Sequence, residues 1–379
     1  EQRKPTDEER LFVNFYLDDE LRPELNLASA IPLTKDKRLS TVLLFHGSAD
    51  TDVREMDHNH DLFRDQPETN LLSFSNRWLY QAVGGTQLRW GFKLLQENRL
   101  GGMMDYDDEE RSLMARDWDW ATEGKEMPLY GSHLRNREAG GYFKIGTPIG
   151  KAVWSEEEQE EIRSNLMAMV DYDHYDQSAY FGLNDYAGNE NVVSLNTAYQ
   201  HYFTYRSSLI LGLQAFHSSI NERLQSYTPW IDTNPHLVNA FDFDRAEQEV
   251  GLYGEYTYAI KDKFSVIVGV RGDYNAFYDR FLFTPRGHLR WNITPLLALR
   301  LSAGHSSGMR NTLYSQNISG IDVSSTALLR DTRSRSTSFS ISSTKNFPSL
   351  YANLSAGANY GFGDGEQAID EDVIKTYSN

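Results

Sequence analysis

Residues 249–260 read EVGLYGEYTYAI, and this stretch decides the fold. Alternate side chains of an extended chain point to opposite faces. One face here carries Val250, Leu252, Tyr256, Tyr258 and Ile260, and the other carries Gly251, Tyr253, Glu255, Thr257 and Ala259. Apolar residues at every second position predict a β-strand with one apolar face and one mostly polar face.

The next stretch, residues 264–274, repeats the pattern, with only Lys261, Asp262 and Lys263 between the two. Strand, short turn and strand predict an antiparallel hairpin. The same alternation continues through most of the chain. It predicts about fifteen strands, at residues 9–18, 24–33, 39–49, 70–81, 85–97, 137–147, 163–175, 190–203, 207–219, 247–260, 264–275, 282–292, 296–306, 333–344 and 349–361.

Short and long connections alternate along the chain. The short ones are residues 34–38, 83–86, 204–206, 261–263, 292–295 and 346–348, and the long ones are 50–69, 98–136, 220–246 and 307–332. Outer-membrane barrels sort their connections in this way, with short periplasmic turns and long extracellular loops. The link 147–163 is the exception, and its acidic run Glu156–Glu161 predicts a short periplasmic helix.

The composition excludes several classes of protein. The chain has 379 residues, a net charge of −17 and a pI near 5.0, which argues against binding to nucleic acid. It has no Cys, so disulfides, Fe–S clusters and Cys-ligated zinc are excluded. The mean hydropathy is −0.57, and no apolar run approaches the ~18 residues of a membrane helix. Membrane strands stay compatible with that value, because only alternate residues are apolar.

Aromatic and charged residues occupy separate positions along the strands. Trp78, Trp90 and Trp291 lie beside short turns, which is typical of an aromatic girdle at a membrane interface. The face opposite the apolar one is charged in mid-strand, at Arg77, Arg89, Lys93, Glu255, Arg271, Asp273, Arg286, Arg290 and Arg300. Such charges are too costly to bury unpaired in a dry core, so we expect them to line a wet or plugged lumen.

At this point the chain resembles a known family, the TonB-dependent outer-membrane receptors. The resemblance covers about residues 9–310 and is carried by RLFVN at 10–14, NRW at 76–78, DQSAYFG at 176–182, EYTY at 255–258, VGVRGDYN at 268–275, FTPR at 283–286, NITP at 292–295 and LRLSAG at 299–304. It implies a partial 22-stranded, transmembrane, antiparallel, up-and-down β-barrel.

In that family an N-terminal plug precedes the barrel and engages the energy-transducing TonB complex. No plug is seen in this chain, and the final strands of the family's barrel are not seen either. We therefore expect residues 1–379 to form one partial β-barrel domain with an open or incomplete wall. Closure would need every strand to pair on both sides, because unpaired backbone groups are costly in hydrocarbon.

An acidic stretch in the connection 50–69 is a candidate metal site. Asp57, Asn59, Asp61 and Asp65 offer oxygen ligands at positions one, three, five and nine, a spacing that can wrap a Ca²⁺ ion. The glycine usual at position six is Leu62, and no Glu stands at position twelve. The alternative is an acidic turn in an extracellular loop.

Nine aromatic residues in or beside the long connections are candidates for ligand binding. They are Tyr106, Trp118, Trp120, Tyr172, Tyr175, Tyr180, Phe181, Tyr227 and Trp230. Aromatic surfaces above a lumen stack flat or amphipathic ligands, and the alternative is packing of loop on loop. No catalytic motif such as Gly-x-Ser-x-Gly or His-Glu-x-x-His occurs, so we expect no enzymatic activity.

The leading hypothesis is the barrel of a receptor for TonB-dependent uptake of a scarce nutrient. The resemblance implies a siderophore-like metal chelate, a cobalamin or a glycan as substrate, and the outer membrane of a Gram-negative bacterium as location. The expected partners are outer-membrane lipid, the TonB complex through the plug region, and a surface lipoprotein. The alternative is a soluble, secreted, β-rich adhesin or carbohydrate-binding protein.

Overall fold

The computed structural model describes residues 11–18, 21–50, 57–104, 106, 130–155, 160–182, 184–228, 236–310, 332–347 and 352–368. These residues form strands and connections only. None of them belongs to a helix long and apolar enough to cross a membrane.

Sixteen strands are described, in close agreement with the alternation in the sequence. They are β1 (Phe12–Leu17), β2 (Pro23–Pro32), β3 (Leu39–Ser48), β4 (Glu68–Gln81), β5 (Gln87–Gly102), β6 (Gly131–Ser155), β7 (Glu160–Phe181), β8 (Asn184–Thr204), β9 (Ser207–Thr228), β10 (His236–Ile260), β11 (Phe264–Asn275), β12 (Arg280–Phe283), β13 (Arg286–Thr294), β14 (Leu297–Arg310), β15 (Thr332–Phe347) and β16 (Ala352–Ala368).

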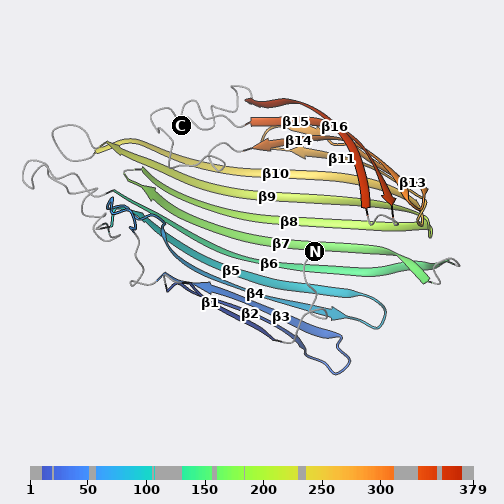
Figure 1. Ribbon diagram of the computed structural model, residues 1–379, viewed down its shortest axis with the longest axis horizontal. Coiled ribbons are helices and arrows are strands. Elements are labelled where there is room, and N and C mark those ends of the chain that lie inside the picture. Colours follow the sequence, from blue (N-terminus) through green and yellow to red (C-terminus); the bar gives the residue numbers. More distant parts are fainter. Residues whose placement is uncertain are drawn as a thin grey trace, which may run out of the picture.

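All the strands belong to one sheet, in which each pairs with its neighbours in sequence. The order runs from β1 to β11 and then β13 to β16, every pairing is antiparallel, and β12 pairs with β11 beside this path. Figure 1 shows the strands side by side in one curved wall, with β1 at one edge and β16 at the other. No pairing joins β1 to β16 in the described part of the chain, so the wall is open there, as the sequence predicts.

The connections sort by end of the sheet. At one end they span only residues 33–38, 82–86, 156–159, 205–206, 261–263, 295–296 and 348–351. The opposite end carries 49–67, 103–130 and 311–331, which are the long ones. Lys37, Gly85 and Asp262 have φ values of 56°, 86° and 58° in the short turns, where the chain reverses within a few residues.

Several strands are longer than the sequence predicts. The predicted loop 220–246 is wrong, because β9 and β10 continue to Thr228 and from His236 and leave only 229–235 between them. The predicted helix at Glu156–Glu161 is also wrong at its end, since Glu160 and Glu161 pair with β6; residues 156–159 lie outside the described residues. The apolar residues of the extensions change face: Ala179, Phe181 and Leu224 lie on the side opposite to Val170 and Ala215. The alternation of each strand is therefore interrupted where its extension begins.

The predicted strand 282–292 is two strands, β12 and β13. Pro285 lies between them and cannot donate a ladder hydrogen bond. β12 pairs with the last residues of β11, and β13 pairs with its first residues. Both pairings keep the apolar positions on one face, so the sheet continues across the break.

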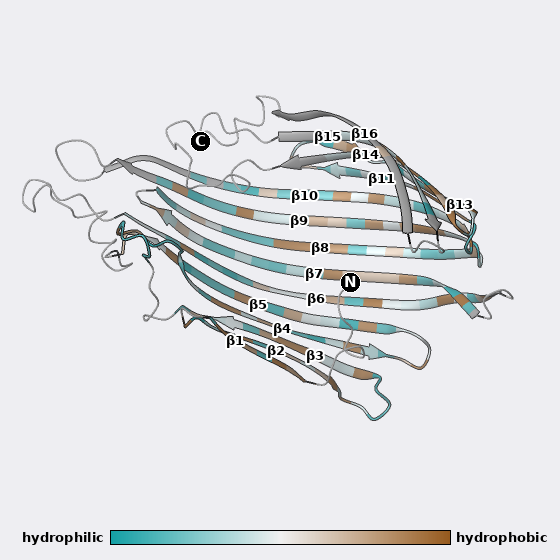
Figure 2. Cartoon of the chain, in the orientation of Figure 1, coloured by the Kyte–Doolittle hydropathy of each residue, from teal (hydrophilic) through white to brown (hydrophobic). Residues whose placement is uncertain are grey.

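The two faces of the sheet differ in chemistry, and the strand register aligns them from strand to strand. One row of cross-strand neighbours is Phe143, Val170, Leu195, Ala215 and Val250. Val250 keeps 50% of its surface exposed and Val170 44%, so no described element covers this row of the face. We call it the apolar face. Figure 2 shows the long strands becoming more hydrophilic toward the end with the long connections.

Aromatic pairs border the apolar face near the short turns. Trp78 of β4 and Trp90 of β5 stack with ring centroids 6.0 Å apart and planes 8° from parallel. Phe264 of β11 is the cross-strand partner of Trp291 of β13, which is 48% exposed. Partly exposed indole rings that pair with other aromatic rings near the short turns suit a membrane–water interface, where an apolar ring carries a polar N–H.

Candidate functional site

The opposite face, which we call the polar face, carries networks of charged side chains. Near the middle of the wall, the Lys93 ammonium contacts the Glu138 carboxylate and lies 3.0 Å from an Asp173 oxygen. Gly140 lies between Lys93 and Asp173 in the register, and a Cβ there would overlap the Asp173 carboxylate. The absence of a side chain at residue 140 thus lets charges from β5 and β7 meet across β6.

A second group of side chains lies on the same face, closer to the long connections. The Asn136 amide donates to a Glu97 oxygen at 2.8 Å. Its carbonyl oxygen accepts from the Tyr175 hydroxyl at 3.0 Å and from the Gln177 amide at 2.9 Å. Arg99 binds the other Glu97 oxygen at 2.5 Å. Together with Lys93, Glu138 and Asp173, these residues form what we call the lumenal network.

A third group joins β9, β10 and β11. The Arg271 guanidinium binds the Asp273 carboxylate at 2.5 Å and donates to Gln214 at 2.8 Å. Further along the wall, Arg286 binds Glu255 at 2.6 Å. Residues that the sequence places on a charged lumen-facing surface therefore pair with one another, which offsets the cost of lowering the local dielectric around them.

Four of the basic residues that the sequence places on this face, namely Arg77, Arg89, Arg290 and Arg300, form no ion pair with a described residue, and two of them are neighbours. Arg290 of β13 and Arg300 of β14 are direct cross-strand partners. Arg290 donates to Asn292 at 3.3 Å and Arg300 to Thr344 at 3.1 Å, both neutral acceptors. Like charges directly opposite each other destabilise a sheet, so this part of the polar face is positively charged.

The candidate aromatic residues whose side chains the structure describes do not converge on one surface. Tyr175 joins the lumenal network, and Phe181 packs on the same face against a buried cluster of Ala179, Tyr186 and Leu224. Tyr172 is even-numbered on β7, like the exposed Val170, and therefore lies on the apolar face, where it donates to Asn191 at 2.8 Å.

Tyr180 shares that face with Tyr172, and its hydroxyl accepts from Tyr106 at 2.7 Å. Tyr172, Tyr175, Tyr180 and Phe181 are strand residues rather than loop residues. Tyr227 belongs to β9, and nothing further is described of its side chain. Trp118, Trp120 and Trp230 lie outside the described residues. Of the candidates described, Tyr175 and Phe181 face the side that carries the polar networks.

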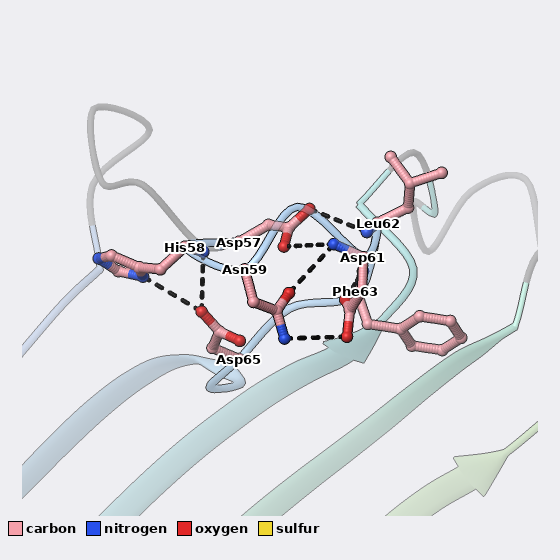
Figure 3. A network of polar contacts seen from close by, with 7 residues as sticks. All are labelled: Asp57, His58, Asn59, Asp61, Leu62, Phe63 and Asp65. Carbon is pink, nitrogen blue, oxygen red and sulfur yellow. Dashed lines mark hydrogen bonds and ion pairs between the residues drawn. The ribbon is translucent and has the colours of Figure 1, made fainter.

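The acidic stretch forms a compact loop held by its own backbone (Figure 3). The Asp57 carboxylate accepts from the backbone N–H groups of Asp61 and Leu62 at 3.1 and 2.9 Å. Asn59 accepts from the Asp61 N–H at 3.0 Å, and the Asp61 carboxylate accepts from the Phe63 N–H at 2.9 Å. These side chains act as caps of the turn, a common role for Asp and Asn.

Asp65 closes the loop. It accepts from the His58 backbone N–H at 2.9 Å and contacts the imidazole at 3.1 Å. The hydrogen bond from the His58 backbone lowers the pKa of the Asp65 carboxyl below its ordinary value. Among the described residues, no three carboxylates or imidazoles come together as metal ligands would. A Ca²⁺ ion bound by Asp57, Asn59, Asp61 and Asp65 stays a prediction, and it would have to compete with these backbone hydrogen bonds.

Sequence reasoning did not identify Glu97, Asn136, Glu138, Asp173 or Gln177 as site residues. Each stands at a polar position of a strand, where an isolated polar residue is ordinary. Only the register shows that the polar positions of β5, β6 and β7 line up. The signal that could have found them is the succession of three strands, β5, β6 and β7, that each carry polar residues on the face opposite to the apolar one.

Known proteins resemble this chain in both sequence and fold. A family model described as "TonB dependent receptor-like, beta-barrel" matches residues 57–360. No curated protein matches the chain significantly.

Solved structures match over most of the chain. The alcaligin outer membrane receptor FauA from Bordetella pertussis has 13% identity and a TM-score of 0.55, over 90% of this chain and 49% of FauA. FpvA of P. aeruginosa, solved with heterologous pyoverdines, has 11% identity and a TM-score of 0.60, over 93% of this chain and 48% of FpvA. The siderophore receptor PiuA from Acinetobacter baumannii has 11% identity and a TM-score of 0.54, over 89% and 54%.

At these identities the structures show a shared fold, and the chain spans about half the length of the proteins that it matches. The family model covers most of the chain, from the connection before β4 to β16. The match agrees with the two-faced antiparallel wall, its short turns at one end and its long connections at the other. The chain belongs to the TonB-dependent receptor β-barrel family.

Proposed function

We propose that this chain forms part of the barrel wall of a receptor that takes up a scarce nutrient across the outer membrane of a Gram-negative bacterium. The observation that carries the proposal is the contrast between the faces: exposed apolar side chains on one, charged networks on the other. A soluble protein rarely exposes so large an apolar surface. A membrane barrel places it against lipid and encloses the polar face as a lumen.

The height of the apolar face supports this placement. On β4 the apolar face runs from Tyr80 to Leu72, eight residue steps. At about 3.3 Å per residue and a tilt of roughly 40° this spans about 20 Å, close to the ~25 Å apolar band of membrane barrels. The strands β6–β10 continue well beyond it, toward the end with the long connections. We assign that end to the cell exterior.

We propose a siderophore-like metal chelate as the substrate class, with cobalamin and glycan as the alternatives. The names of FauA, FpvA and PiuA point to siderophores, and this supports testing that class first. Energy would come from the TonB complex acting through a plug. A surface lipoprotein is a further candidate partner. We propose no enzymatic role, because the family consists of receptors and transporters.

Uptake by living cells tests this function. Cells with and without the gene receive radiolabelled ferric hydroxamate, ferric catecholate, cobalamin or oligosaccharide. We expect gene-dependent accumulation of one ferric chelate, abolished when the inner-membrane energy source is collapsed. Gene-dependent uptake of cobalamin or oligosaccharide instead would change the substrate class. Uptake of none, or a protein that stays soluble without detergent, would favour the secreted β-rich adhesin or carbohydrate-binding protein.

Substitutions of two tyrosines of β7 distinguish a loss of ligand binding in the lumen from a general effect on folding. Tyr175 lies in the lumenal network, and Tyr172 lies three residues away on the apolar face. If Tyr175 contacts the ligand, Tyr175→Ala should weaken binding about tenfold, as truncation of an aromatic contact commonly does. Tyr172→Ala is the control and should leave the dissociation constant unchanged. Equal effects of the two substitutions would remove Tyr175 from the binding site.

A further inference from the structure

The apolar face changes abruptly to a polar surface at one level of the wall. On β5 the outward side chains run Phe92, Leu94 and then Gln96, and on β6 Ala139 is followed by Arg137. The register makes Leu94 the neighbour of Ala139 and Gln96 the neighbour of Arg137. The boundary therefore falls at the same level on β5 and β6, and on β4 it falls one step higher, between Leu72 and Asn70. In the proposed placement, this level is the outer edge of the hydrocarbon, where lipid headgroups begin.

A recess of about 270 Å³ opens at this boundary. It extends over β4, β5 and β6, and its lining includes Asn70, Gln96, Asn98, His133, Arg135 and Arg137. Arg135 is the direct cross-strand neighbour of Asn98, and Arg137 is that of Gln96. Two guanidinium groups and several amides thus surround a small cavity immediately above the apolar band.

The arginines of the recess are not held by carboxylates. Among the described residues neither Arg135 nor Arg137 forms an ion pair, although two carboxylates lie nearby: Glu68 lines the recess and Asp176 is the cross-strand partner of Arg137. Arg223 of β9 gives the contrast. It lies in the same row of the register as Arg135, through Ser178 and Ala187, and it binds Asp242 at 3.1 Å. Of the two outward arginines of this row, Arg223 is held in an ion pair, whereas Arg135 can bind an anionic ligand.

Two polar atoms of the recess lack partners. The Arg135 Nε, a donor, and the Asn98 Oδ1, an acceptor, are both buried and make no hydrogen bond with any described residue. A buried polar group without a partner costs about 1–3 kcal/mol. A ligand that satisfies both must accept a hydrogen bond at one point and donate one at another. A phosphate beside a sugar hydroxyl has this pair of functions, with oxygens for the guanidinium and O–H for the amide oxygen.

We propose that this recess binds the headgroup of a phosphorylated glycolipid in the outer leaflet of the membrane. The phosphate lies against Arg135 and Arg137, a sugar hydroxyl donates to Asn98, and the acyl chains extend over Leu94, Ala139 and the apolar surface beside them. The inference rests on the proposed membrane placement of the apolar face, and it adds a lipid site distinct from the lumen, on the opposite face of the wall.

The test uses the intact receptor, purified from its membrane in mild detergent, in three forms: wild type, R135Q/R137Q and R223Q. Phosphorylated glycolipid retained by each form is measured by mass spectrometry of the lipid extract. We expect the double variant to retain about tenfold less than wild type, because it loses two charge-assisted contacts. R223Q removes an exposed arginine of the same row, one that is already paired with Asp242, and should retain the wild-type amount. Equal retention by all three forms would overturn the proposal.

A second measurement separates the lipid from its phosphate. Lipid-stripped wild-type receptor is titrated with the phosphorylated glycolipid, with its dephosphorylated form and with inorganic phosphate. The dephosphorylated form should bind weakly, and millimolar inorganic phosphate should not displace the intact lipid. Displacement at equal concentrations would reassign the recess to a free phosphate ion. Equal binding of the dephosphorylated form would show that apolar contact alone holds the lipid, which also overturns the proposal.

The outcome does not depend on the nutrient. If R135Q/R137Q retains as much lipid as wild type while nutrient uptake is gene-dependent, the lipid site fails and the proposed function stands. A receptor that needs no detergent would instead refute the membrane placement, and the lipid site with it. Circular dichroism of R135Q/R137Q is the folding control. A strand content equal to that of wild type shows that the variant has lost lipid while keeping its fold.

Discussion

Tyr253 shows how single residues on the polar face depend on their neighbours across the sheet. Its hydroxyl donates to Asn196 at 3.1 Å, two strands away, and its ring lies over Gly212 of the strand between them. The Arg271 guanidinium lies 5.9 Å from the ring centroid. The ring can cross β9 only because residue 212 has no side chain, so a glycine on one strand positions a tyrosine on the next.

Gly212→Ala should therefore destabilise the sheet. The new Cβ would overlap the Tyr253 ring, which must leave its position and give up the contact with Asn196. Overpacking of this kind costs about 1–3 kcal/mol. Urea unfolding of the refolded protein in detergent measures it. Gly287→Ala is the control, since the nearest atom to a Cβ there is 3.9 Å away. A similar midpoint for the two variants would contradict the role of Gly212.

At the scale of the element, β11 shows how far sequence reasoning reached. Its alternation predicts that Val266, Val268 and Val270 share one face, and that Arg271 and Asp273 share the other. The structure confirms this division: Val268 and Val270 are 53% and 48% exposed, whereas Asp273 is buried in a pair with Arg271. Leu301 of β14 is on the apolar face and Arg300 on the polar face, also as predicted. Alternation sufficed because each of these strands has one apolar face.

The two faces of β11 should differ in their tolerance of charge. Val268→Arg places a guanidinium on the apolar face and should cost about 2–4 kcal/mol near the middle of the membrane. Ile267→Arg, one residue away, faces the polar side between Thr257 and His288 and should cost much less. Unfolding in lipid vesicles compares them. Equal tolerance at the two positions would refute the assignment of the faces.

Prediction was weaker where the apolar residues of a strand change face. In the extensions of β6, β7 and β9 the apolar residues, among them Leu134, Ala179 and Leu224, lie on the face opposite to the apolar face, and the sequence assigned much of these extensions to loops. Their strands form because the neighbouring strand supplies a partner for each backbone N–H and C=O. The lumenal network could not be predicted for a related reason. Pairing of Lys93 with Asp173 depends on the register of three strands.

For the whole molecule, the open wall and the sorted connections set the orientation. β1 and β16 are the edges of the sheet within the described residues. The long connections 49–67, 103–130 and 311–331 share one end, and every connection at the other end is short. We place the long connections outside the cell and turns such as Lys261–Lys263 in the periplasm.

Labelling at the two ends of β4 tests this orientation. The chain has no Cys, so a single introduced thiol gives a single labelled site within it. Pro67 precedes β4 at the long-connection end, and Val83, which is 81% exposed, follows it at the short-turn end. In intact cells a membrane-impermeant maleimide should label Pro67→Cys, and it should label Val83→Cys only after the outer membrane is permeabilised. The reverse pattern would invert the topology.

Four features could be predicted from the amino-acid sequence: the fold class, the approximate positions of the strands, the two faces of the wall and the alternation of its connections. These are local properties, since a side-chain period of two and turn residues are written in consecutive positions. Only the tertiary structure decided which residues meet: the lumenal network, the paired and unpaired arginines of the outward row, and the backbone caps of the acidic loop. Each depends on the register between strands that lie far apart in the chain, and a shift of one residue would exchange the two faces.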